Sequence, residues 1–267
     1  MKATDMKKVI LALAAGALLA APALAEEFVV AKPDGSQLSV VADFPAGEGP
    51  FAAIVLAPGQ GYHMHLPALE VTAHALTEQG IAVFRFNWTY YTAQPQGQPS
   101  EDLSKELQDL QAVISAARKH PNVLPKNISV GGKSLGTVVA WKAFAADPTL
   151  RSALFITPIC SRVPDGGTLP RSEAQENYPG FQAERRPTLS ISGDKDSLCA
   201  PAMLYQFAGA SIGPARVAIV GGDHSFENKA LLGAAADAAR ARNIVAVSVV
   251  AAGFVAETAG TSALQLR

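Results

Sequence analysis

The motif G-K-S-L-G at residues 132–136 places Ser134 between two glycines. A β-type run, residues 127–131, precedes it, and a helix-type run, residues 137–146, follows it. A sharp turn between the two would lift the serine hydroxyl above the end of a sheet, and the glycines would let strand and helix approach closely. The hydroxyl would sit at a helix N-terminus, which favours developing negative charge. The pattern therefore predicts Ser134 as a nucleophile.

A phosphate-binding loop is the competing interpretation of these residues, because G-K-S also ends the motif G-x-x-x-x-G-K-[ST]. That motif needs a glycine at position 127, where this chain has Asn127. The residues that would form its open loop, 128–131, are β-type instead. An ordinary turn between a strand and a helix is the third interpretation.

A serine hydroxyl needs a base to take its proton and a third group to orient that base. His224 follows the last β-type run, residues 217–220, whereas the other four histidines precede Ser134. In serine sites built at the strand ends of a mainly parallel sheet, the three residues follow along the chain in the order serine, acid, histidine. His224 is therefore the predicted base. Asp196 follows the preceding β-type run and is the predicted acid, with Asp194 as the alternative.

Acyl transfer also requires donors for an oxyanion. The backbone N–H of Leu135, directly after the nucleophile, is the first predicted donor. The second is expected from the loop after the apolar run 51–57, with Gln60 preferred and Gly61 next. Gly61 and Tyr62 on that loop are also predicted to contact the substrate.

Other side chains near these loops have less specific roles. Trp88, at the end of another β-type run, either contacts the substrate or pairs with neighbouring loops. His63 and His65 have weak metal-ligand spacing and no evident third ligand. No metal and no cofactor are therefore predicted.

The elements that must position these residues alternate between strand and helix, which predicts a mainly parallel sheet with right-handed crossovers. Ligands of such sheets gather at the carboxyl ends of the strands. The predicted strands are 27–32, 38–44, 51–57, 81–86, 127–131, 153–156, 188–192 and 217–220. The predicted helices are 67–78, 100–119, 137–146, 201–208, and a segment from 225 to the end with a break near 243.

The serine motif, the loop 193–196 and residues 222–226 together resemble the α/β-hydrolase superfamily, and within it the dienelactone-hydrolase-like enzymes. Residues 84–87 and Cys199 resemble the branch with the testis-expressed protein 30 and NSL-complex subunit 3 type domain. This resemblance implies an α/β fold with an eight-stranded sheet flanked by helices, and a Ser-Asp-His triad. The insertion 161–180 lies where caps grow in this fold, and its short length predicts a minimal cap.

Residues 1–25 have the features of a signal peptide, with early lysines, an apolar run at 9–19 and an A-x-A site at 23–25. The mature chain, 26–267, is then one exported domain in the periplasm or the medium. A formal net charge of −1 argues against a nucleic-acid partner. The apolar stretch 244–255 is too short for a membrane span and is expected to pack on the fold.

Cys160 and Cys199 each follow an apolar β-type run. If those strands are neighbours, the two Cα atoms could lie within bridging range, and export would permit the bond. The alternative is a pair of buried thiols.

These residues together predict an exported serine hydrolase that cleaves small or medium carboxylic esters through an acyl-enzyme, with activity falling at acid pH as His224 is protonated. Thioesterase and peptidase activity are variants that the sequence does not separate. A catalytically silent binding or interaction module on the same fold is the alternative from another class. Substrate identity and oligomeric state stay open.

Overall fold

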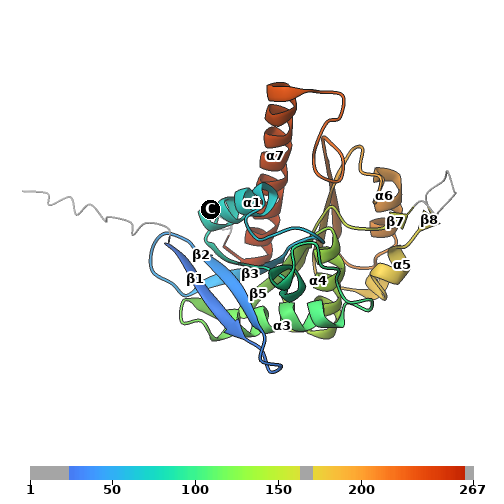
Figure 1. Ribbon diagram of the computed structural model, residues 1–267. Coiled ribbons are helices and arrows are strands. Elements are labelled where there is room, and N and C mark those ends of the chain that lie inside the picture. The colour runs from blue at the N-terminus through green and yellow to red at the C-terminus, as the bar shows by residue number, and fades with distance from the viewer. Residues whose placement is uncertain (1–23, 163–170, 262–267) are drawn as a thin grey trace, which may run out of the picture.

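The computed structural model describes residues 24–162 and 171–261, and its main feature is one eight-stranded sheet (Figure 1). The strand order is β1-β2-β4-β3-β5-β6-β9-β10. The β1–β2 and β2–β4 pairs are antiparallel, and all other neighbours are parallel, which confirms the predicted mainly parallel sheet. The strands are β1 (Leu24–Ala31), β2 (Gln37–Phe44), β3 (Phe51–Ala57), β4 (Ile81–Phe86), β5 (Val123–Lys133), β6 (Ala153–Ile156), β9 (Thr188–Gly193) and β10 (Ala215–Val220).

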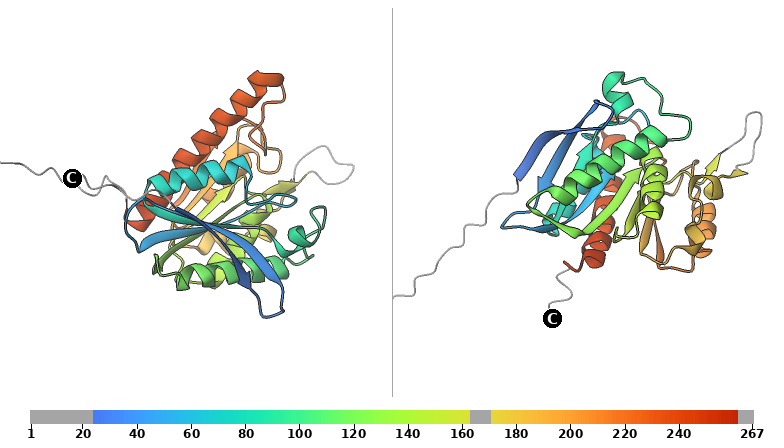
Figure 2. Two further views of the ribbon diagram at one scale, coloured as in Figure 1. Left: turned by 60° about the vertical axis from the view of Figure 1, so that its left-hand side comes forward. Right: turned by 90° about the horizontal axis from the view of Figure 1, so that it is seen from below.

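Helices cover both faces of this sheet (Figure 2). Helices α1 and α7 pack against each other on one face, and α3 and α4 pack together on the other. Helix α6 packs against β9 and β10. The helices are α1 (Pro67–Glu78), α2 (Thr89–Ala93), α3 (Ser104–Lys119), α4 (Leu135–Ala146), α5 (Ala174–Asn177), α6 (Pro201–Gly209) and α7 (Gly233–Ala259), with a 3₁₀ turn, η1 (Phe181–Ala183).

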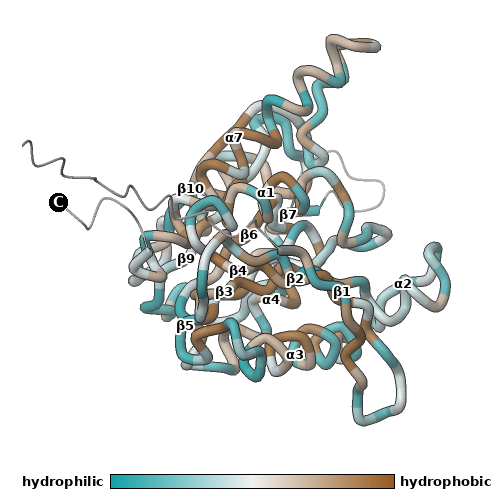
Figure 3. The backbone as a smooth tube through the Cα atoms, turned by 90° about the vertical axis from the view of Figure 1, so that its left-hand side faces the viewer, coloured by the Kyte–Doolittle hydropathy of each residue, from teal (hydrophilic) through white to brown (hydrophobic). Residues whose placement is uncertain are grey.

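Strand β3, at the centre of the sheet, is apolar at nearly every position because both of its faces are buried. Successive side chains of a strand point to opposite faces, and both faces are covered here. Ala53 and Val55 belong to the core under α3 and α4, while Ile54 and Leu56 belong to the core under α1 and α7. The tube coloured by hydropathy shows β3 and β4 as apolar segments inside a more polar periphery (Figure 3).

The predicted N-terminal hairpin is present as β1 and β2, closed by a turn in which Asp34 Oδ1 accepts a hydrogen bond from the Ser36 N–H at 2.9 Å. Strand β1 begins at Leu24 and includes Ala25, so it starts two residues before the predicted mature end. The rest of the predicted signal peptide, residues 1–23, lies outside the described residues.

Two helices, α3 and α7, begin several residues later than the sequence predicts. Helix α3 begins at Ser104 instead of residue 100, because Asp102 Oδ1 accepts the Ser104 N–H at 3.0 Å while the Ser100 side chain bonds to Glu106. Helix α7 begins at Gly233 and runs unbroken through Asn243. The Asn243 amide reaches out to the Phe226 carbonyl at 3.0 Å and leaves the helix backbone intact.

Helix α7 is long and apolar enough to cross a membrane by length and composition alone, and its apolar part extends well beyond the stretch 244–255. In this fold 44% of its most apolar 18-residue window is buried. Its inward side chains, Ile244, Val247 and Ala251, pack in the core with α1 and the sheet. This packing agrees with the expectation that residues 244–255 pack on the domain.

The segment between β6 and β9 stands where the small cap was predicted. Its described part holds a two-stranded ribbon of β7 (Ser161–Arg162) and β8 (Arg171–Ser172), followed by α5 and η1. Residues 163–170 of the predicted insertion lie outside the described part of the chain.

Candidate active site

Ser134 lies on a sharp turn between β5 and α4, as the motif predicted. Its φ of 53° is in the left-handed region, which is unusual for a serine and is the strained geometry of a nucleophile elbow. Gly132 and Gly136 make the turn possible, because a Cβ on Gly132 would collide with the Gly136 backbone and one on Gly136 with the Ala57 carbonyl. The hydroxyl therefore stands at the carboxyl end of β5, and the residue is 8% exposed.

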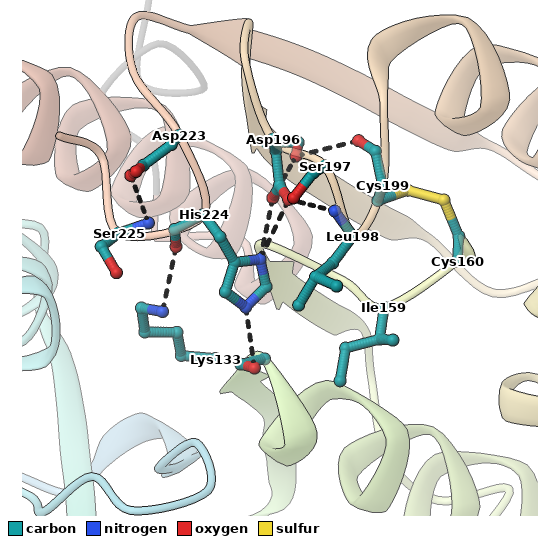
Figure 4. Close-up of polar contacts among 12 residues, drawn as sticks. Lys133, Ile159, Cys160, Asp196, Ser197, Leu198, Cys199, Asp223, His224 and Ser225 are labelled. Carbon is teal, nitrogen blue, oxygen red and sulfur yellow. Dashed lines mark hydrogen bonds and ion pairs between the residues drawn. A yellow bond between two sulfur atoms is a disulfide. The ribbon is translucent and has the colours of Figure 1, made fainter. Parts of the chain in front are cut away.

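His224 and Asp196, on the loops after β10 and β9, face each other at hydrogen-bonding distance (Figure 4). His224 Nε2 lies 2.8 Å from Ser134 Oγ. His224 Nδ1 lies 3.0 and 3.1 Å from the two carboxylate oxygens of Asp196. An imidazole in this position can accept the serine proton at Nε2 while the carboxylate orients its Nδ1–H.

Asp196 is held by donors as well as by the histidine. Ser192 Oγ donates to Asp196 Oδ2 at 2.9 Å, and the Leu198 N–H donates to Oδ1 at 2.9 Å. Its side chain is fully buried, and these donors stabilise the charge that burial would otherwise disfavour. Asp194, the alternative acid, instead accepts the Gly222 N–H at 2.7 Å and does not contact His224.

The loop after β3 lies directly against Ser134. A Cβ built on Gly59 would be 3.2 Å from Ser134 Cβ, so the loop backbone passes at van der Waals distance. Among the described residues, the backbone N–H groups of Gln60 and Leu135 donate to no other group. Both are therefore available in the region where an oxyanion would form, and the Gln60 side chain is turned outward to Gln98 at 2.6 Å.

Residues at the end of β4 fix this loop. Trp88 Nε1 donates to the Pro58 carbonyl at 3.0 Å. Arg85 donates to the Met64 carbonyl and pairs with Asp43, while Asn87 Oδ1 accepts the Met64 N–H at 2.8 Å. Trp88, which was predicted to contact the substrate or to pair with neighbouring loops, is completely buried and bonds to the loop after β3.

Tyr62 and Gly61 lie on the same loop, near the base. Gly61 has a φ of 67°, a left-handed conformation that suits glycine and turns the chain. The Tyr62 hydroxyl lies 3.3 Å from Ser225 Oγ, and the Lys133 amine stands 4.7 Å from the centre of its ring. Tyr62 therefore already contacts Ser225 and Lys133 within the protein.

The structure joins Cys160 and Cys199 in a disulfide, as predicted, with the two Cα atoms 4.8 Å apart. The bond connects the loop after β6 with the loop after β9, which carries Asp196 (Figure 4). The Leu198 carbonyl also accepts the N–H groups of Cys160 and Ser161, at 2.9 and 2.8 Å. Asp196 therefore lies on a loop that is held both by the disulfide and by the two hydrogen bonds to the Leu198 carbonyl.

Two supporting residues were missed at the level of sequence. Tyr178 is fully buried, and its hydroxyl contacts Thr137 Oγ1 at 2.7 Å and accepts the Ile159 N–H at 2.9 Å. Thr137 Oγ1 in turn donates to the Ser134 carbonyl at 2.6 Å. Burial raises the pKa of Tyr178, so it stays a neutral hydroxyl. Its sequence position gives no signal, because all of these contacts are distant along the chain.

Lys133, the second missed residue, is buried beside the nucleophile and donates to the His224 carbonyl at 3.2 Å.

His63 and His65 do not form a metal centre in the described chain. The His65 N–H donates to His63 Nδ1 at 3.2 Å, and His65 Nδ1 lies 3.0 Å from Glu70. Within residues 24–162 and 171–261, no group of three or more His, Cys, Asp or Glu side chains is placed to hold a metal ion.

Solved structures share this fold at low sequence identity. A serine hydrolase homologue from Coxiella burnetii aligns with a TM-score of 0.63 at 20% identity, covering 84% of this chain and 96% of its own. The esterase domain of a Rhodothermus marinus protein gives 0.63 at 19%, covering 88% and 99%. Dienelactone hydrolase from Anabaena variabilis gives 0.63 at 17%, covering 87% and 96%.

Sequence comparison gives a family but no individual relative. A search of curated protein sequences found no match. A family model described as alpha/beta hydrolase domain matches residues 50–252, which span the strands and loops that carry Ser134, Asp196 and His224. The chain therefore belongs to the alpha/beta hydrolase domain family.

Proposed function

We propose that this protein is a serine hydrolase that cleaves carboxylic esters through an acyl-enzyme. The observation that carries the proposal is the continuous chain of contacts from Ser134 Oγ through His224 to Asp196, at 2.8 Å and 3.0 Å. Three residues from separate strand ends meet at hydrogen-bonding distance, in the order and roles that nucleophilic catalysis requires.

In the first half-reaction Ser134 Oγ attacks the ester carbonyl carbon while His224 Nε2 takes the hydroxyl proton. The oxyanion that forms would accept hydrogen bonds from the N–H groups of Leu135 and Gln60. The C–O bond to the alcohol then breaks, and His224 gives its proton to the leaving oxygen. In the second half-reaction His224 activates a water that attacks the acyl-serine, and the acid and Ser134 are released.

Esters are favoured as substrates because two of the similar structures are described as an esterase domain and a dienelactone hydrolase. Thioester and peptide hydrolysis follow the same steps and are tested by changing the leaving group. The closer likeness to the testis-expressed protein 30 and NSL-complex subunit 3 type domain is part of the proposal, and it is supported by residues 84–87 and Cys199.

Export to the periplasm or the medium is proposed on two grounds. Residues 1–25 have the sequence features of a signal peptide, and the disulfide between Cys160 and Cys199 suits an oxidising compartment. Mass spectrometry of the protein secreted by an expressing bacterium tests this. A mature N-terminus at Glu26 supports export, and an intact N-terminus in the cytoplasm contradicts it.

The test of the activity is hydrolysis of p-nitrophenyl acetate by the wild-type protein and by Ser134→Ala. The variant is expected to lose nearly all turnover, and also all labelling by a fluorophosphonate probe. Ser197→Ala is a matched control, because Ser197 is an exposed serine beside the acid and is expected to keep both signals. A wild-type protein that neither hydrolyses esters nor labels at Ser134 would indicate the silent binding module instead.

A further inference from the structure

Lys133 is a buried amine that the triad chemistry does not use. It precedes the nucleophile on β5 and is only 3% exposed. Its Nζ donates to the His224 carbonyl at 3.2 Å and lies 4.7 Å from the centre of the Tyr62 ring. The other charged groups that act on it are Asp196, Asp223 and Arg240.

Tyr62 connects this amine to the two loops on either side of the nucleophile. It belongs to the loop after β3, and a Cβ on Gly59 would come within 2.6 Å of its ring, so the ring packs against that loop. Its hydroxyl reaches Ser225, the residue after the base, at 3.3 Å. Lys133 and Tyr62 together therefore touch the oxyanion loop, the nucleophile strand and the base loop.

The side chain of His224 contacts Ser134 and Asp196, and its main chain has a separate partner. Asp223 Oδ1 accepts the N–H groups of Ser225 and Glu227 at 2.9 and 3.0 Å, which shapes the turn after the histidine. Among the described residues, the Lys133 amine is the group that bonds to the His224 main chain (Figure 4). A shift of that carbonyl would move the imidazole away from Ser134 Oγ.

We infer that Lys133, packed on Tyr62, is a positioning residue that holds the His224 main chain so that its imidazole spans Ser134 and Asp196. This inference rests on the proposed hydrolase function. A displacement of about 1 Å in a catalytic group can cost about 100-fold in rate, so a single anchor on the base has a measurable effect.

The charge of Lys133 gives the anchor a distinctive pH dependence. Burial lowers the pKa of the Lys133 amine to about 8, with Asp196 and Asp223 acting in the opposite direction and Arg240 adding to the decrease. Hydrogen bonds from a charged donor are stronger than those from a neutral one. The hold on His224 is therefore expected to weaken as the pH rises through about 8.

The experiment measures kcat and KM for p-nitrophenyl acetate from pH 6 to 10 in the wild type, Lys133→Met and Lys126→Met. Lys126 is an exposed lysine on the same strand and serves as the control. We expect Lys133→Met to lower kcat by about 10- to 100-fold with KM within about twofold. The wild type and the control should lose activity above about pH 8, and Lys133→Met should lack this alkaline decline. Equal kcat values, or the same decline in Lys133→Met, would overturn the inference.

Tyr62→Leu provides a second variant in case Lys133→Met does not fold. It removes the ring under the amine, and it is expected to lower kcat in the same direction. The double variant should be little slower than the slower single variant, because both act on one anchor. Fully additive losses would show that the two residues act separately and would contradict the inference.

Nuclear magnetic resonance separates this inference from the proposed function. The proton on His224 Nδ1, shared with Asp196, should give a downfield signal that persists in the wild type and broadens in Lys133→Met. If the wild type has no turnover but the two proteins differ in this signal, the hydrolase proposal is wrong and the inference about Lys133 stands. If the signal is unchanged in the folded variant, only the inference about Lys133 is contradicted.

Discussion

Asp194 and Asp196 lie two residues apart on the loop after β9, yet their carboxylates hold different partners. Asp196 faces His224 Nδ1 at 3.0 Å, whereas Asp194 accepts the Gly222 N–H at 2.7 Å and so fastens the loop that leads to the histidine. One carboxylate contacts the imidazole of His224, and its neighbour shapes the turn before that histidine.

Asp196→Asn is expected to lower kcat by about 1,000- to 10,000-fold, because an amide does not stabilise the imidazolium and favours the wrong tautomer. Asp194→Asn keeps an acceptor for Gly222 and is expected to stay within about tenfold of the wild type. Steady-state rates of the two variants check this difference. Equal losses would mean that the acid is wrongly assigned.

Removing the disulfide should reduce stability and activity together. Cys160 and Cys199 are 39 residues apart in sequence, and closing a loop of this length stabilises a fold by about 3–4 kcal/mol in the chain-entropy account. The double variant Cys160→Ala/Cys199→Ala is therefore expected to unfold at lower urea concentration. Its kcat should also fall, because the bridge holds the loop that carries Asp196.

A reducing agent added to the wild type is the matched test of the same bond. It should lower the urea midpoint of the wild type and leave that of the double variant unchanged. A double variant with wild-type stability would contradict the prediction.

Trp88→Phe is expected to lower kcat by about tenfold with little change in KM, since it frees the Pro58 carbonyl and loosens the loop that carries the Gln60 N–H. The loss of one buried hydrogen bond should reduce the free energy of unfolding by about 1 kcal/mol. Trp141→Phe is the control, because Trp141 Nε1 also donates to a proline carbonyl, that of Pro179, at 3.0 Å. It should lose similar stability with a much smaller change in rate.

Lys133→Met should make the protein more stable at pH 7. The pKa of Lys133 falls from 10.5 to about 8 on folding, so folding opposes its protonation at neutral pH. The penalty is full below about pH 8 and disappears as the pH approaches 10.5, where the unfolded chain also loses the proton. After allowing for the lost hydrogen bond, the gain at pH 7 is about 2 kcal/mol.

Urea unfolding of the wild type and Lys133→Met at pH 7 and pH 10 measures this gain. The difference between them should shrink at the higher pH, because other titrating groups are common to both proteins. A less stable variant at pH 7 would indicate that the buried amine is a structural contact. A more stable but slower variant would separate its role in positioning from a role in folding.

The strand boundaries show how far local pattern reaches. Residues 51–57, 81–86 and 153–156 were predicted with the limits that the structure has, because a strand buried on both faces is a short apolar run between polar turns. The ends of α3 and α7 were wrong by several residues. The start of α3 depends on the hydrogen bond that Asp102 accepts from the Ser104 N–H, and the predicted break in α7 is absent because Asn243 directs its amide to the Phe226 carbonyl.

The sequence by itself determined the type of fold, the sharp turn at Ser134 and the chain order of Ser134, Asp196 and His224, because these follow from periodicity, glycine placement and chain order. Only the tertiary structure decided which aspartate faces His224, that Trp88 supports a loop from inside the core, and that Lys133 contacts the base. Such relationships join residues dozens of positions apart. They depend on the register of parallel strands and the path of loops, which no local spacing encodes.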